Sequence, residues 1–125
     1  MSLNATTALA AALLLAGLIN LLPLAGVLGA TRLLGLYGMA FDDPSLRILM
    51  RHRAVLFGLL GGATLAAAFI PAWRVPMAPA ALVSMLSFIA LAALEGGGNT
   101  AIRRVVLADV VASVLLAAAL LWTRR

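Results

Sequence analysis

The chain has 125 residues, 65% of them hydrophobic and 10% charged, with a mean hydropathy of +1.15 and a formal net charge of +5. In soluble domains only about half of the residues are apolar, and a small domain leaves much of its chain exposed, so lipid must surround much of this one. The absence of cysteine excludes disulfides and thiolate metal sites. The arginines lie at the edges of apolar runs, which favours membrane anchoring and argues against nucleic acid as a partner.

Four apolar runs define the expected architecture. They cover approximately 5–30, 46–70, 76–95 and 101–122. About 20 residues of α-helix cross the hydrocarbon core of a bilayer, so each run is long enough for one span. The connections between runs are short and therefore make consecutive spans antiparallel. The sequence predicts an all-α fold, an integral membrane antiparallel four-helix bundle that forms a single domain over 1–125.

The first run is interrupted past its midpoint by Asn20 and Pro23. It differs from a cleaved signal peptide because no Arg or Lys precedes it and because the apolar stretch is too long, so we expect a retained helix. An asparagine inside a membrane usually bonds to a neighbouring helix, and we expect this of Asn20. The connector over 32–43 has amphipathic character and is expected in the membrane interface, with Tyr37 at headgroup level.

The second span is expected to begin at an aspartate cap, Asp42 or Asp43, with Pro44 in the first helical position. The uncharged stretch 54–70 nearly fills the hydrocarbon core, so the cluster 51–53 must lie at or just beneath the interface. Arg51 and Arg53 are about 200° apart on a helix, and only one of them can face the bundle. The Gly58–Gly62 spacing predicts close approach of another helix.

The third and fourth spans are joined by a glycine turn. Ser84 and Ser87 in the third span are expected to bond to carbonyls of their own helix. Asn99 or Thr100 is expected to cap the fourth span. Asp109 then lies about 8 Å further along the axis than the arginines of the first turns. A carboxylate at that depth normally faces the bundle and finds a partner.

Antiparallel spans bring most of the charged groups to one membrane face. We expect a ligand-binding layer there made of Arg51, His52, Arg53, Glu95, Asn99, Arg103, Arg104 and Asp109. Six arginines lie on this face and three on the other, where Trp73 and Trp122 complete an ordinary anchor. The excess of arginine predicts a bacterial inner-membrane protein whose charged face and two adjoining loops are cytoplasmic.

Three interpretations of the charged layer remain open. Helix N-termini and arginines at one level form an anion site for a lipid phosphate or a carboxylated amphiphile, without a cofactor or metal. Alternatively His52, Glu95 and Asp109 act as acid and base in a small lipid-modifying enzyme. In the third interpretation the acids only neutralise arginines and fix helix register, in a structural or accessory subunit of a larger membrane complex or in a homo-oligomer.

Several segments together resemble a group of small four-span bacterial integral membrane proteins. The segments are 36–38, 43–44, 49–61, 68–71, 84–88, 99–104 and Asp109. The resemblance spans most of the chain and implies the four-span fold and the membrane location, but no mechanism. Some members of the group carry the name phosphopantetheine adenylyltransferase. This sequence does not support that activity, because it offers neither the nucleotide-binding histidine motif nor the parallel sheet of such a soluble α/β enzyme.

Overall fold

The computed structural model describes residues 4–124, and every regular element in that part of the chain is a helix. In chain order the elements are α1 (Ala5–Leu21), the 3-10 helix η1 (Leu22–Leu28), α2 (Ala30–Tyr37), α3 (Pro44–Phe69), the 3-10 turn η2 (Pro71–Trp73), α4 (Arg74–Leu94) and α5 (Thr100–Thr123). The four helical stretches Ala5–Leu28, Pro44–Phe69, Pro71–Leu94 and Thr100–Thr123 are long and apolar enough to cross a membrane. Their bounds lie within a few residues of the expected spans.

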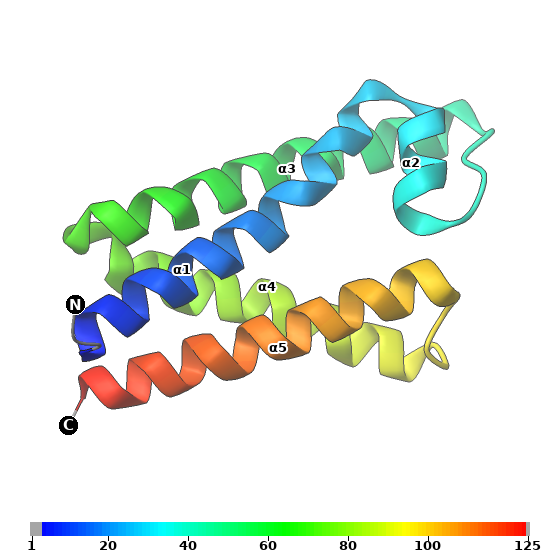
Figure 1. Ribbon diagram of the computed structural model, residues 1–125. Helices are drawn as coiled ribbons and strands as arrows, with labels where there is room; N and C mark the ends of the chain where they lie inside the picture. Colours follow the sequence, from blue (N-terminus) through cyan, green and yellow to red (C-terminus); the bar gives the residue numbers. More distant parts are fainter. Residues whose placement is uncertain (1–3, 125) are drawn as a thin grey trace.

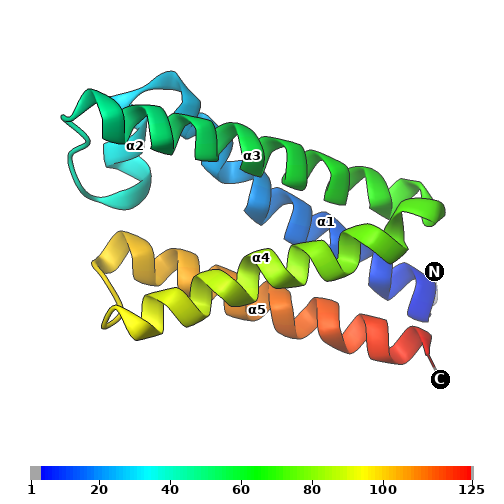
Figure 2. The same cartoon turned by 180° about the vertical axis from the view of Figure 1, so that it is seen from behind.

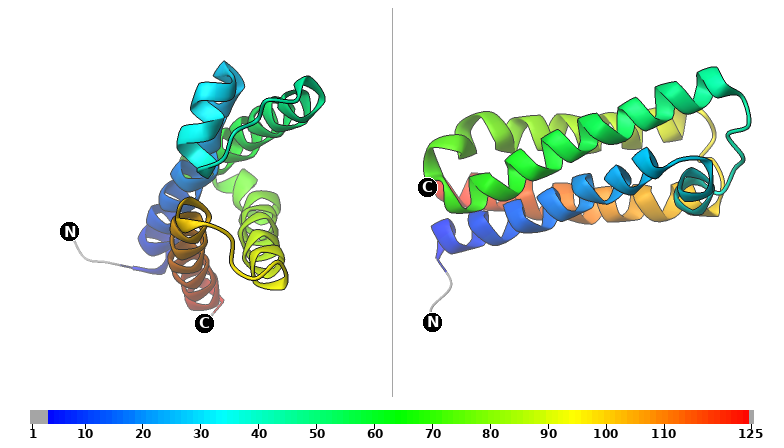
Figure 3. Two further views of the ribbon diagram at one scale, coloured as in Figure 1. Left: turned by 90° about the vertical axis from the view of Figure 1, so that its right-hand side faces the viewer. Right: turned by 90° about the horizontal axis from the view of Figure 1, so that it is seen from above.

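The four long helices lie lengthwise beside one another, and the two ends of the chain lie at the same end of the molecule (Figures 1 and 2). α1 packs mainly against α3 and α5, and α4 packs against the same two helices. Seen along its length, the bundle therefore has α1 and α4 on one diagonal (Figure 3). The short helix α2 lies at the end opposite the termini, which carries most of the charged side chains.

The first stretch is not the continuous α-helix expected over 5–30. α1 begins at an Asn4 cap whose side chain accepts from Thr7 N, and it ends at Leu21. The chain then continues as 3-10 helix to Leu28. Pro23 explains the change, because it has no N–H to donate to the carbonyl four residues earlier and its ring crowds that carbonyl. At Gly29, with φ of 126°, the chain turns out of this direction into α2.

α1 and α3 approach one another closely through glycines. A methyl group at Gly61 would lie 2.5 Å from the backbone nitrogen of Leu21, and one at Gly17 would lie 2.8 Å from the backbone nitrogen of Leu65. Gly58 contacts Leu24 of η1, whereas nothing lies within 4 Å of a methyl group at Gly62. The expected glycine contact therefore exists, but Gly61 rather than Gly62 forms it.

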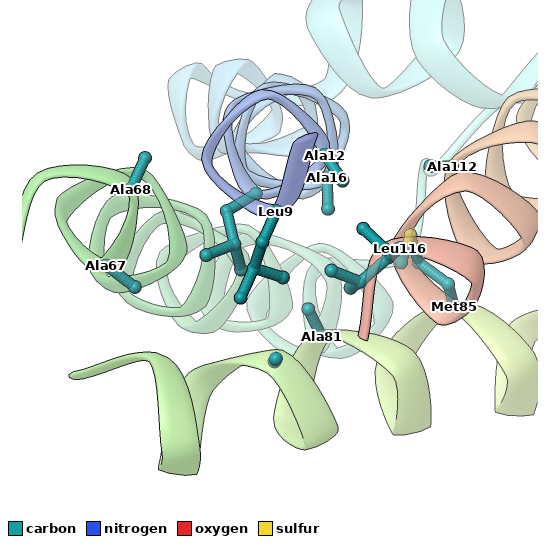
Figure 4. Packing of buried hydrophobic residues seen from close by; sticks show 12 residues of the cluster. Leu9, Ala12, Ala16, Ala67, Ala68, Ala81, Met85, Ala112 and Leu116 are labelled. Carbon is teal, nitrogen blue, oxygen red and sulfur yellow. The ribbon is translucent and has the colours of Figure 1, made fainter. Parts of the chain in front are cut away.

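The buried apolar side chains form two separate clusters. The larger cluster occupies the half of the bundle nearer the termini and draws on all four long helices (Figure 4). Its buried members are Leu9, Ala12, Leu13, Ala16, Ala67, Ala68, Ala78, Ala81, Met85, Ala112, Leu116 and Ala119. The smaller cluster is formed by Leu33, Tyr37 and Phe41 at the opposite end. Two of the buried polar residues, Asn20 and Asp109, lie between the two clusters, whereas Ser113 lies on α5 between Ala112 and Leu116 of the larger one.

The glycine contact gives a matched test of the helix packing. Gly61→Ala should lower the thermal stability of the detergent-solubilised protein, because a methyl group there meets backbone and overpacking costs about 1–3 kcal/mol. Gly62→Ala meets open space and should leave stability unchanged or raise it by up to about 1 kcal/mol through better helix propensity. Equal melting temperatures for the two variants would contradict the close approach of α1 and α3 at Gly61.

Candidate functional site

A cavity of about 220 Å³ lies between the two apolar clusters, and all four long helices contribute to its wall. Its volume far exceeds the ~10–15 Å³ that one water molecule needs. The polar lining residues are Asn20, Tyr37, Arg53, Ser84, Arg104 and Asp109. The apolar lining residues are Ile19, Leu22, Pro23, Leu36, Phe57, Phe88, Val105 and Ala108. Charged groups and a hydrocarbon-like wall thus share one space.

Arg53 is the arginine of the 51–53 cluster that faces the bundle. Its Nη1 donates a hydrogen bond to the hydroxyl oxygen of Tyr37. Its guanidinium carbon lies 4.5 Å from the centre of the Phe57 ring, and the rings of Tyr37 and Phe88 lie at 5.3 Å and 5.9 Å. Cation–π attraction of this kind is worth ~2 kcal/mol when the cation is desolvated. The guanidinium is therefore fixed in place by three helices.

Arg51 points away from the cavity, as the 200° offset requires. Its side chain is exposed, and its Nε donates to the carbonyl oxygen of Val27 at 2.7 Å. This contact satisfies a carbonyl at the end of the 3-10 segment η1, where regular helical bonding stops. Arg51 thus connects α3 to η1 on the outside of the bundle.

Asp109 lies deep in α5 and lines the cavity. Its exposed fraction is 5%, and within residues 4–124 it takes part in no hydrogen bond and no ion pair. The expected direct pairing of this carboxylate with an arginine is therefore not found. Buried carboxylates normally accept hydrogen bonds, so the lack of a partner for this one in the described chain needs an explanation.

Asn20 and Ser84 form a polar bridge between α1 and α4 at the cavity wall. Asn20 donates from Nδ2 to the carbonyl oxygen of Ala16 at 2.8 Å and accepts at Oδ1 from Ser84 Oγ at 2.9 Å. The prediction that Asn20 bonds to a neighbouring helix is confirmed. Ser84 does not bond to its own helix as expected, whereas Ser87 does, at 3.0 Å from the Ser84 carbonyl oxygen.

The helix α2 closes the cavity at the charged end. Asn99 caps α5 by accepting from Ile102 N and also donates from Nδ2 to the carbonyl oxygen of Tyr37 at 2.7 Å. Leu33, Tyr37 and Phe41 are at most 5% exposed. These three side chains of the connector therefore pack into the bundle and are not exposed on its surface, while the depth of the connector in the membrane stays a prediction. They pack inward because the cap of α5 holds the C-terminal end of α2 over the bundle.

The structure separates the eight residues expected in the ligand-binding layer into two groups. Arg53, Arg104 and Asp109 line one cavity. The other five, which are Arg51, His52, Glu95, Asn99 and Arg103, do not line it. Among the acid and base candidates, His52 and Glu95 are exposed and lie outside the cavity that Asp109 lines, so the three are not brought together.

Sequence reasoning missed the aromatic part of the site. Phe57 follows Arg53 by four residues, so the two share a helix face, and this spacing was a usable signal. Phe88 and Tyr37 come from other helices, and no local pattern relates them to Arg53. No group of three His, Asp or Glu side chains that could hold a metal ion occurs in the described residues.

Comparison of the chain with protein-family models, with curated proteins and with solved structures finds no match.

The double role of Asn99 can be tested with two substitutions. Asn99→Asp keeps an acceptor for the cap of α5 but removes the donor to the Tyr37 carbonyl, so amide hydrogen exchange should accelerate about five-fold or more in residues 30–37 only. Asn99→Ala removes both bonds, and exchange should accelerate in residues 30–37 and in the first turn of α5. Unchanged amide exchange in α2 of the Asn99→Asp variant would show that the bond from Asn99 to the Tyr37 carbonyl does not hold α2 over the cavity.

Proposed function

We propose that this protein is an antiparallel four-span bundle of the bacterial inner membrane that binds an anionic amphiphile in the cavity between α1, α3, α4 and α5. The observation that carries the proposal is the presence of Arg53 and Arg104 in one cavity whose remaining wall is largely apolar. Ligand sites typically combine such an apolar lining with a few convergent polar groups.

The geometry of Arg53 supports an anion site. A guanidinium has five N–H donors, and among the described residues Arg53 uses one of them, for the Tyr37 hydroxyl. The aromatic rings around it restrict its motion without occupying the remaining donors. A phosphate or carboxylate bound there meets donors that are already oriented, which lowers the entropic cost of binding.

Arg104 supplies the second positive group, toward the charged end of the bundle. Its side chain is exposed yet lines the cavity, and it lies in the first turns of α5, near the positive end of that helix dipole. An anion between Arg104 and Arg53 would therefore meet positive charge from two helices. Methylene groups of the same ligand would contact the apolar wall, for example at Leu22 and Phe57.

Binding fits the geometry better than acid–base chemistry does. A general acid and base must lie within hydrogen-bond reach of the reacting atoms. His52 and Glu95 are exposed outside the cavity, so only Asp109 of the three candidates would meet a ligand bound there. A role as accessory subunit of a larger complex predicts a stable protein partner, and it is an outcome of the test below.

Two pairs of arginines provide matched variants for this test. Arg104→Ala should lower the amount of anionic lipid that co-purifies with the protein, or its affinity, by about ten-fold, because one charge-assisted contact is lost. Arg103→Ala, a neighbouring exposed arginine outside the cavity, should have little effect. The second pair, on α3, compares Arg53→Gln, which should lower the amount of bound lipid, with Arg51→Gln, which should have little effect. Native mass spectrometry of the gently purified protein measures bound lipid in all four variants.

Equal losses in each pair would show that lipid binds to a diffuse positive surface and would overturn the cavity as its site. A purified protein without bound lipid, but with a stable partner subunit, would overturn the proposal in favour of the accessory role.

The proposed membrane orientation is testable because the chain has no native cysteine. A cysteine at Glu95, in the exposed turn at the charged end, should react with a membrane-impermeant maleimide only after intact cells are lysed. A cysteine at Arg124, at the opposite end, should react in intact cells. The reverse labelling pattern would place the charged end outside the cytoplasm.

A further inference from the structure

Asp109 is the feature of the cavity that an anion alone does not explain. Arg53 and Arg104 attract a negative ligand, whereas a carboxylate beside them repels it. The side chain is 5% exposed, lines the cavity and has no hydrogen-bond or ion-pair partner in residues 4–124. Buried carboxylates normally accept hydrogen bonds, so a ligand with a donor group would satisfy the requirement that the protein leaves open.

We propose that the amphiphile carries a hydroxyl group beside its anionic group and that Asp109 accepts a hydrogen bond from this hydroxyl. The inference rests on the proposed function, since it concerns the same ligand in the same cavity. The chemical class is a glycerol-phosphate-type amphiphile with a free backbone hydroxyl, as opposed to a simple alkyl phosphate or a fatty acid.

The positions of the three charged residues fit such a ligand. Arg104 lies nearer the start of α5, and Asp109 lies five residues deeper, about 7.5 Å along the helix axis. A phosphate at the outer position would leave the next carbon atoms of the ligand at the depth of Asp109. The hydroxyl of a glycerol backbone occupies that place, whereas an alkyl phosphate has only methylene groups there.

Charge balance favours a hydroxyl over an ammonium group as the donor. With the Asp109 carboxylate ionised, two arginines and one aspartate give the cavity a net charge of +1. A monoanionic ligand with a neutral donor brings the sum to zero, whereas a zwitterion leaves a positive charge that the partly apolar site must hold uncompensated. The Asn20–Ser84 bridge satisfies its own polar groups at the wall and does not supply a donor to Asp109.

Two ligands that differ in a single group test this inference on the full-length delipidated protein in detergent. The first is 1-oleoyl-glycero-3-phosphomethanol, which is monoanionic and has one hydroxyl, and the second is its 2-deoxy counterpart. The wild-type protein should bind the hydroxyl ligand about ten-fold more tightly, because the deoxy ligand leaves the buried carboxylate without a donor. Isothermal titration calorimetry or native mass spectrometry measures both affinities.

Variants at Asp109 separate the hydroxyl contact from anion binding. Asp109→Leu should abolish the preference for the hydroxyl ligand without lowering the affinity for the deoxy ligand. If the leucine variant does not fold, Asp109→Asn replaces it. Asparagine keeps a neutral acceptor and the polar character of the site, so the preference should be reduced. Asp42→Asn changes an exposed carboxylate outside the cavity at the same end and should retain the full preference.

The outcomes distinguish the two proposals. Equal wild-type affinities for the two ligands would overturn the role of Asp109 while leaving the anion site intact. Tighter binding of the corresponding 2-amino ligand than of the hydroxyl ligand would also overturn it, in favour of an ammonium donor. Failure of both ligands to bind, with the arginine variants indistinguishable from wild type, would overturn the proposed function itself.

Discussion

The arrangement of the charged end depends on a half-buried guanidinium held within the bundle. Arg53 contacts Tyr37 of α2, Phe57 of its own helix and Phe88 of α4. The cost of placing a cation at this depth is offset by its hydrogen bond and by the faces of the aromatic rings. These contacts replace the tight Leu and Ala packing of the other half of the bundle, and the cavity lies where that packing ends.

The position of α2 over the cavity depends on the contact between Arg53 and Tyr37 together with the Asn99 cap of α5. Tyr37 accepts from Arg53 through its hydroxyl and from Asn99 through its backbone carbonyl, so one residue of α2 is tied to both α3 and α5. Gly38, with φ of 69°, lets the chain leave α2 directly after this residue. A Cβ atom added at Gly38 would lie 3.2 Å from Asn99 Nδ2 and 3.3 Å from Ala101 Cβ. A side chain at this position would be strained and would crowd the cap of α5. The short helix is consequently part of the bundle and not a loose connector.

Local patterns in the sequence predict the four long helices and several of their ends well. Caps at these two helix starts are confirmed, and the structure selects Asp43 over Asp42 and Asn99 over Thr100. Such caps can be predicted because a side-chain oxygen needs only the next few backbone N–H groups as partners. Helical periodicity also establishes that only one of Arg51 and Arg53 can face inward. It does not select Arg53, because the choice depends on aromatic rings contributed by α2 and α4.

The remaining features arise from tertiary contacts that no single segment encodes. Ser84 bonds across to Asn20 because α1 places an amide oxygen beside it, and in the absence of that neighbour its own helix would supply the acceptor. The spacing of Leu33, Tyr37 and Phe41 places them on one face, which could contact either lipid or protein. The packing of α2 against α5 turns this face toward the protein. The sequence therefore identifies which residues are unusual for a membrane helix but not which of them meet.

The geometry at Asp109 bears on the choice between a structural and a ligand-binding role for the charged layer. If the acid served only to neutralise an arginine and fix helix register, a direct contact between the two groups would be expected, because the attraction falls with distance. Arg53 instead contacts rings and a hydroxyl, while Asp109 faces the cavity without a partner in the described chain. The guanidinium of Arg53 and the carboxyl group of Asp109 therefore both have unused hydrogen-bonding capacity in the cavity. Their separation leaves donors on Arg53 and an acceptor on Asp109 for a third participant, which is the role that we propose for the ligand.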